Sequence, residues 1–194
     1  QKNILALLAQ KYEQWLFERN NQLKEKVYLL AASEYTKLIQ YEPLNTQLHL
    51  ALADIYIELA HTCKQELDQY KHTWLLILKD EIVEKQKQID WYCNHAIQEC
   101  NIVETASGND KQIFLKKAYV YRIKQLHEKE CIEIEKVLKI TPDDLDLWYK
   151  LGILYFRLGN TFKGLEIYKR LKNNQYPNAK KMTIFYESQK SIFK

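Results

Sequence analysis

The sequence is poor in the residues that interrupt helices. Its 194 residues include only 4 glycines and 3 prolines, and neither type occurs between Pro43 and Gly108. Glycine and proline are the residues least compatible with a helix interior, and they mark the turns that connect strands. No stretch alternates apolar and polar residues between such turns. The sequence therefore predicts an all-α chain, with the length of one domain or slightly more.

Long apolar runs are also missing. The apolar runs that occur, such as WLLIL at 74–78, fall short of the roughly 18 apolar residues that a membrane span requires. The short run ILALLA at 4–9 lacks an extended basic lead-in and a small-residue cleavage site, so it does not read as a signal peptide. The chain begins with Gln1, which leaves an upstream anchor or signal open.

Cysteines are few and scattered. The four stand at 63, 93, 100 and 131, and no two of them form a CxxC pair. In a helical chain of this length, such cysteines are typical of small buried side chains in a reduced state rather than of a disulfide framework. We therefore predict a cytoplasmic, reducing compartment.

Motifs for catalysis or phosphate binding are absent from the sequence. It contains no HExxH, GxSxG, Walker-type or GxGxxG pattern. His127 and Cys131 stand one helical turn apart, but two ligands are too few for a closed zinc site, and a structural role fits them better. We expect no catalytic residue, no metal, no cofactor and no enzymatic activity.

A strong spacing motif stands near the C-terminus, in the stretch 145–177. Trp148, Leu151, Gly152 and Tyr155 follow the pattern W-x2-L-G-x2-Y, and Gly164, Tyr168 and Pro177 come after them. This pattern resembles the tetratricopeptide repeat. The resemblance implies a right-handed superhelix of stacked antiparallel helix pairs, with about nine to eleven helices in a single domain over 1–194. The usual output of such a fold is a concave surface that holds a peptide or helix of another protein.

The same 34-residue step extends towards the N-terminus. Phe114, Ala118 and Tyr121 precede Trp148, Gly152 and Tyr155 by 34 residues, and Trp15 precedes His49 by the same distance. The step predicts clearer units at 111–144 and 145–177, degenerate units near 12–45, 46–79 and 77–110, and a capping helix over 178–194.

Three features of the sequence lead to further predictions about the helices. The polar pair Asn20 and Asn21 predicts a break between helices over 2–19 and 23–40. Over 60–106, a third repeat unit and one or two long helices packed as a coiled pair are equally open. Glu130 stands where the motif expects a small residue, which favours looser packing there.

The predicted groove combines aromatic and basic residues. By the resemblance, the helices near 111–123 and 145–158 turn a second stripe towards the concave side. Aromatic side chains anchor a ligand at low entropic cost, and basic side chains bind carboxylates, so we expect a partner segment that is acidic and hydrophobic. The predicted partner-binding residues are Leu115, Lys116, Tyr119, Arg122, Tyr149, Lys150, Ile153, Phe156 and Arg157.

One known use of the family is disfavoured. Members that clamp the carboxylate end of heat-shock chaperones carry asparagines on the groove helices, whereas the matching places here hold Asp54, Tyr119 and Ile153. The sequence therefore favours a scaffold, an adaptor or another kind of chaperone, of which a secretion-type chaperone is one version.

Charge leaves two alternatives open. From Lys111 onward there are 18 basic and 9 acidic residues, against 11 and 16 before it. The basic half could bind nucleic acid or an anionic membrane, although no RNA-binding signature supports this. It could also dock on the acidic half of a second copy, which would make the chain a self-associating structural subunit of a larger assembly.

Overall fold

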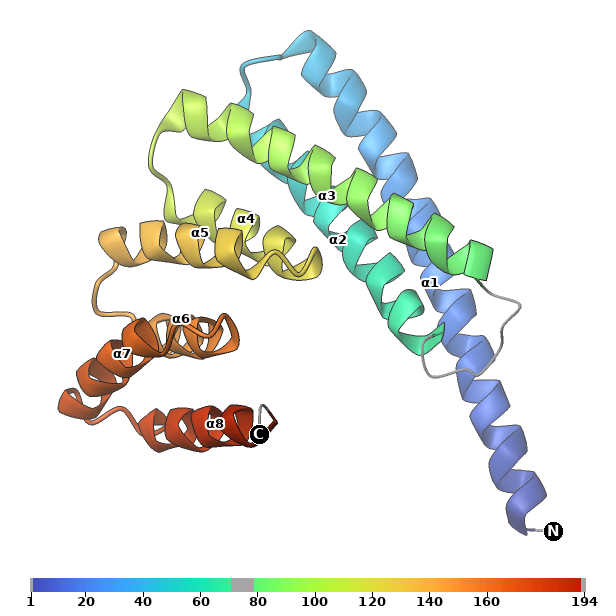
Figure 1. Cartoon of the computed structure of the whole chain (residues 1–194). Coiled ribbons are helices and arrows are strands. Elements are labelled where there is room, and N and C mark those ends of the chain that lie inside the picture. Colours follow the sequence, from blue (N-terminus) through green and yellow to red (C-terminus); the bar gives the residue numbers. More distant parts are fainter. Residues whose placement is uncertain (1, 71–78, 193–194) are drawn as a thin grey trace. The chain divides into compact units, whose positions relative to one another are not determined.

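The computed structural model describes residues 2–70 and 79–192, and all the regular structure in these ranges is helical. This confirms the all-α prediction, with tetratricopeptide-like stacked helix pairs in the C-terminal part (Figure 1). The described residues form eight helices: α1 (Lys2–Tyr41), α2 (Thr46–Tyr70), α3 (Lys79–Ser107), α4 (Lys111–Ile123), α5 (His127–Ile140), α6 (Leu145–Arg157), α7 (Thr161–Asn173) and α8 (Ala179–Ile192). They divide into two compact units, Gln1–Gly108 and Asn109–Lys194. That both units belong to a single repeat domain stays a prediction.

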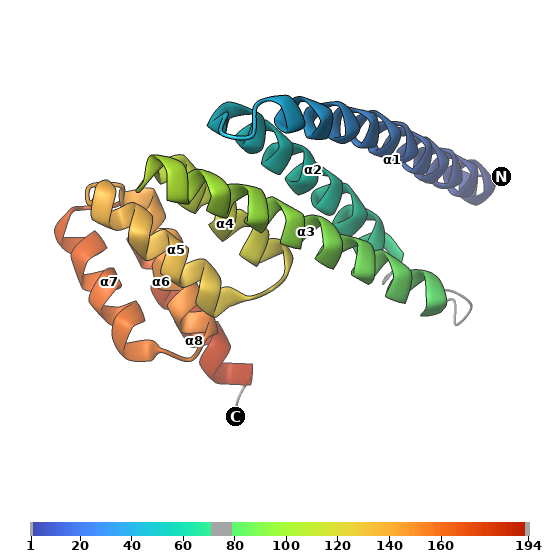
Figure 2. The same cartoon turned by 90° about the horizontal axis from the view of Figure 1, so that it is seen from above.

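Unit 1 is built from three long helices. α2 and α3 run side by side and bury a shared seam that includes Leu59, Cys63, Ile89 and Cys100 (Figure 2). This arrangement corresponds to the long-helix alternative for the region after residue 60. The apolar run at 74–78 lies outside the described residues, and so do residues 71–78 at the end of the predicted unit 46–79.

The predicted break at Asn20 and Asn21 is wrong, because α1 continues without interruption from Lys2 to Tyr41. Asparagine is less favourable than alanine in a helix by less than about 1 kcal/mol, which packing overcomes easily. Asn21 is buried, and Ala32 continues the same inward face three turns later. The stretch 12–45 therefore contains one helix and not the expected helix pair.

Unit 2 follows the repeat pattern closely. α4 with α5, and α6 with α7, form the two predicted helix pairs, and α8 packs on α6 and α7 (Figure 1). The first helix of each pair is capped at its N-terminus by an aspartate. The side chain of Asp110 accepts a hydrogen bond from the Gln112 backbone N–H (2.8 Å), and that of Asp144 accepts one from Leu147 (3.0 Å). Such caps satisfy donors that the first turn of a helix leaves open.

The small residues of the motif lie where helices meet. A Cβ atom added to Gly152 would collide with the Met182 side chain, and one added to Gly164 would collide with the Phe156 ring. These glycines therefore allow α8 to approach α6, and α7 to approach α6. Met182 of α8 is fully buried at this crossing. Leu158, just after the end of α6, is 38% exposed.

The expectation of looser packing at Glu130 is also wrong. Glu130 is fully buried on α5, and its carboxylate accepts a hydrogen bond from Arg122 Nε (2.6 Å) and lies 3.3 Å from His127 Nδ1. A buried carboxylate is tolerated when it is paired and hydrogen-bonded in this way. The ion pairs thus take over the role that close packing on a small residue has in the clearer unit.

Candidate partner-binding groove

A hollow of about 640 Å³ opens on unit 2 beside α6. Its walls come from the end of α4, the start of α5, the middle of α6 and the length of α8. The residues that line it are Arg122, Glu130, Tyr149, Lys150, Ile153, Leu154, Arg157, Lys181, Ile184, Phe185 and Ser188. Three of these helices, α4, α6 and α8, alternate along the chain, and we call this hollow the groove.

The structure brings together five of the nine predicted partner-binding residues. Arg122 comes from α4, and the other four come from successive turns of α6: Tyr149, Lys150, Ile153 and Arg157. They reach the groove because residues three and four apart share one side of a helix. The aromatic and aliphatic side chains therefore lie among the basic ones; that they bind a partner stays a prediction.

Three further predicted residues lie on α4 without lining the groove. Leu115 is 37% exposed, and Lys116 and Tyr119 are half-buried. They occupy the turns of α4 before Arg122, so a long bound segment could reach them, although the hollow itself ends at Arg122.

Phe156 does not belong to the groove. It is 6% exposed, its ring packs on Gly164 of α7, and it stacks with Tyr186 of α8 at a centroid distance of 5.0 Å. The prediction that Phe156 lines the groove is therefore wrong, since α7 already contacts its ring. The addition of α8 covers that edge of α6, and Phe156 becomes part of the core.

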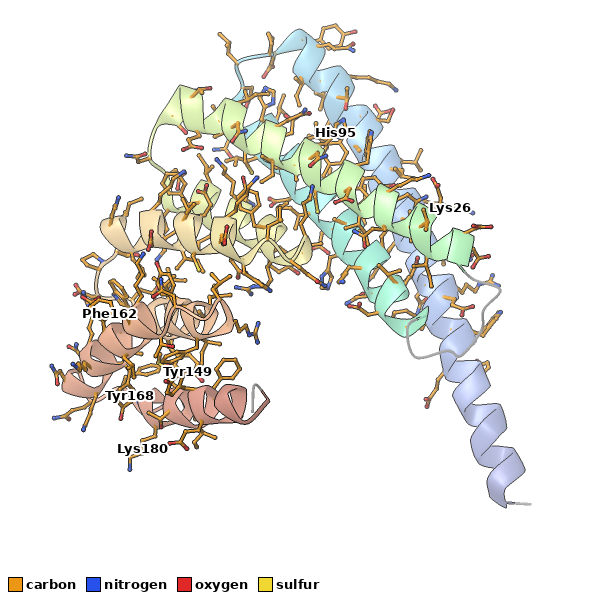
Figure 3. The ribbon with its side chains drawn as sticks, viewed as in Figure 1. Lys26, His95, Tyr149, Phe162, Tyr168 and Lys180 are labelled. Carbon is orange, nitrogen blue, oxygen red and sulfur yellow. The ribbon has the colours of Figure 1, made fainter. Side chains whose placement is uncertain are left out.

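Contacts within the unit hold the groove's aromatic wall. Tyr149, which is labelled in Figure 3, packs against Tyr176 at a centroid distance of 5.7 Å, and the Tyr176 hydroxyl donates a hydrogen bond to Asp146 (2.5 Å). This hydrogen bond, with some burial, raises the pKa of Tyr176. Across the groove, the Arg157 guanidinium lies 5.6 Å from the centre of the Phe185 ring. An aromatic ring thus lies beside each end of α6: Tyr149 near its start, and Phe185 of α8 next to Arg157 at its end.

The groove is electropositive. Arg122, Lys150, Arg157 and Lys181 line it, against the single carboxylate of Glu130. Arg122 is already paired with Glu130, whereas no ion pair joins Lys150 or Lys181 to an acid among the described residues. The surplus positive charge, together with Tyr149 and Ile153, suits a segment that carries both carboxylates and apolar side chains.

Sequence reasoning missed the contribution of α8. Lys181, Ile184 and Phe185 line the groove, yet the region 178–194 was expected to act as a cap. The 34-residue step could have located them, since it relates Ile184 to Lys150 and therefore continues the groove stripe onto α8.

A larger hollow, of about 750 Å³, lies between α5, α6 and α7. Several of the groups that line it are engaged with their neighbours: Arg170 stacks on Trp148 (4.3 Å to the ring centre) and donates to the Pro142 carbonyl (3.0 Å). Tyr155 donates to Glu135, and burial followed by this hydrogen bond raises the pKa of Tyr155 to about 12. These contacts tie the two helix pairs together, so we place the candidate site in the smaller groove.

Metal-ligating and redox chemistry has little support in the described residues. No three His, Cys, Asp or Glu side chains gather there in a way that could hold a metal ion. All four cysteines are free and buried, and burial raises the pKa of the Cys63 thiol to about 11 and that of Cys131 to about 12. Across the same residues, no helix is both long and apolar enough to cross a bilayer.

Comparison with known proteins gives only a likeness in fold. No family model and no curated protein matches the chain. Two solved structures titled as MamA each share 18% identity with it, at TM-scores of 0.40 and 0.41; they cover 79% and 81% of this chain and 91% and 94% of their own. A MamA RS-1 double mutant is 14% identical at a TM-score of 0.38, covering 91% of this chain and 96% of its own. The likeness at this level concerns the course of the helices and transfers no residue role.

Proposed function

We propose that the chain is a non-enzymatic, tetratricopeptide-like interaction module, and that its groove binds a peptide or helix of a partner protein. The observation that carries this proposal is the meeting of Tyr149 and Ile153 with Lys150, Arg157 and Lys181 in one hollow. An apolar floor supplies affinity, and the surrounding cations select for acidic residues. A scaffold or adaptor role follows, because the groove contains binding groups without a nucleophile and base in contact.

The ligand class follows from the two halves of the lining. The half-buried rings of Tyr149 and Phe185 offer flat apolar surface, which favours leucine, phenylalanine or similar side chains in the ligand. Lys150 and Lys181 offer ammonium groups, which favour aspartate or glutamate beside them. An extended strand or a single helix turn could satisfy both.

The test is a peptide-display selection against the full chain, followed by binding measurements on the selected peptides. We expect peptides rich in Asp and Glu alternating with large apolar residues. Their binding should weaken by about tenfold or more in Lys150→Glu and in Tyr149→Ala, since each removes one kind of contact. Lys169→Glu is the matched control, because Lys169 is exposed on α7 away from the groove.

Two kinds of result would contradict the proposal. One is selection of peptides without acidic residues, or equal loss of binding in Lys169→Glu. The other is binding of nucleic acid or anionic vesicles that disappears at high salt and responds equally to any lost cation, which would support the basic half as a general electrostatic surface.

A further inference from the structure

The long helix α1 has two apolar faces, and α2 covers only one of them (Figure 2). Asn21 and Ala32 are buried on the covered face, with Tyr28 half-buried between them. On the opposite face, four large apolar side chains are exposed: Leu16 by 36%, Leu23 by 54%, Val27 by 64% and Leu30 by 70%. A contiguous apolar stripe of this kind marks an interaction surface.

The exposed stripe has the spacing of a coiled-coil seam. Leu16, Asn20, Leu23, Val27 and Leu30 follow one another at intervals of four and three residues. In heptad terms, leucine occupies each d position, and the a positions hold asparagine and valine. Leucine at d with a β-branched residue at a favours a two-stranded pairing, and one asparagine at a fixes its register. The seam therefore fits a single partner helix.

A hollow of about 700 Å³ lies beside this seam, between α1 and Gln65 of α2. Asn21 is one of the residues lining it; it is 3% exposed, and within the described residues its amide Nδ2 has no hydrogen-bond partner. A buried donor without a partner is costly, so this amide is a second sign of a missing group. A carboxylate or carbonyl oxygen entering the hollow would accept its hydrogen bond.

Charge decides which helix fits the seam. Its flanking positions carry Arg19, Lys24 and Lys26, all exposed (Figure 3 labels Lys26). Flanking positions of a coiled coil face each other across the seam, and their charges set the choice of partner. A second copy would bring these cations together, Arg19 of one chain against Lys24 of the other in a parallel pair. A helix with acidic flanks would pair with them.

We propose that this face of α1 docks an amphipathic helix of a partner protein, whose apolar seam is flanked by aspartate or glutamate. The surface lies in unit 1, so it is separate from the groove and does not depend on it. A chain with both surfaces would join two partners, or two segments of one partner.

The test uses the full chain and two synthetic three-heptad helices. Both carry leucine at d, valine at a and one asparagine at a; one has glutamate and the other lysine at the flanking positions. We expect the glutamate peptide to bind, as followed by fluorescence anisotropy, and the lysine peptide to bind at least about tenfold more weakly. Leu30→Glu should abolish binding, whereas the neighbouring Leu29→Glu, 43% exposed but outside the seam, should leave it unchanged.

Several outcomes would overturn this inference. Absence of binding by the glutamate peptide, equal binding of both peptides, or equal loss in Leu29→Glu would each do so. A chain that forms dimers in sedimentation, and loses them in Leu30→Glu, would show that a second copy is the occupant. The groove variant Lys150→Glu should bind the peptide normally, so failure here and failure of the groove proposal are distinguishable.

Discussion

The two units differ in how their helices are ended. Unit 2 has helices of 13 or 14 residues, whose ends are marked by Asp110, Asp144, Gly159 and Asn160. Unit 1 has helices of 40, 25 and 29 residues over a stretch with almost no helix-ending residues. Short helices joined by tight turns stack into pairs with a concave side, whereas long helices leave extended faces. The different density of helix-ending residues thus gives each unit its own kind of surface, on which the two proposals rest.

The close crossing at Gly152 is the feature of unit 2 whose loss should cost most. Gly152→Val places a branched side chain against Met182 and Ile167, and overpacking of this kind costs about 3 kcal/mol. Hydrogen exchange should show lost protection in α6, α7 and α8, with α2 and α3 unchanged, if the units are independently stable. Adding Met182→Ala should recover part of the loss. Equal loss of hydrogen-exchange protection in both units would show that they do not unfold independently.

Sequence reasoning predicted unit 2 far better than unit 1. The motif residues Leu151, Gly152 and Tyr155 are buried where the 34-residue step placed them, because each turn of the repeat has a visible signal. In α1, Asn20 and Asn21 gave a false signal, since a local preference of a fraction of a kcal/mol is smaller than the packing of Asn21 and Ala32. In α1, the sequence therefore predicted the helical conformation but not the length of the helix.

The groove was predictable in part for a related reason. The helical period places Tyr149, Lys150 and Ile153 on one side of α6, and the resemblance to the repeat family implied that this side faces the groove. The burial of Phe156 was not predictable in this way, because it depends on the neighbouring helix α8, and no feature of α6 reports how far that helix reaches over it. The contribution of Ile184 and Phe185 arises from the same contact between elements. Whether a side chain at the edge of a stripe is buried or exposed therefore depends on tertiary packing.

The unbonded amide of Asn21 offers a smaller change in unit 1. Asn21→Leu removes a buried donor that has no partner among the described residues, so we expect the free energy of unfolding to rise by about 1 kcal/mol. The exposed neighbour in Asn20→Leu should leave it unchanged. Urea denaturation followed by circular dichroism measures both. A gain in stability with lost binding of the glutamate-flanked helix would show that the amide is kept for its ligand; a loss of stability would mean that it is satisfied within the unit.

The smallest effect concerns pH and one contact of unit 1. His49 is 5% exposed, and its ring lies 2.5 Å from Glu99 and 3.0 Å from the Pro43 carbonyl. Burial lowers the pKa of His49. The hydrogen bonds to Glu99 and Pro43 and the charge of Glu99 together raise it by more, so the net pKa lies above 6.5. A group with a raised folded-state pKa stabilises the fold fully below its unfolded value. The stability of unit 1 should therefore decline as the pH rises above about 6.5 and through the raised pKa. His49→Gln should remove this decline, and unit 2 should show no decline from this source. The melting temperature of each variant across that pH range measures the decline, and hydrogen exchange separates the two units. A decline that persists in His49→Gln would assign it to another group.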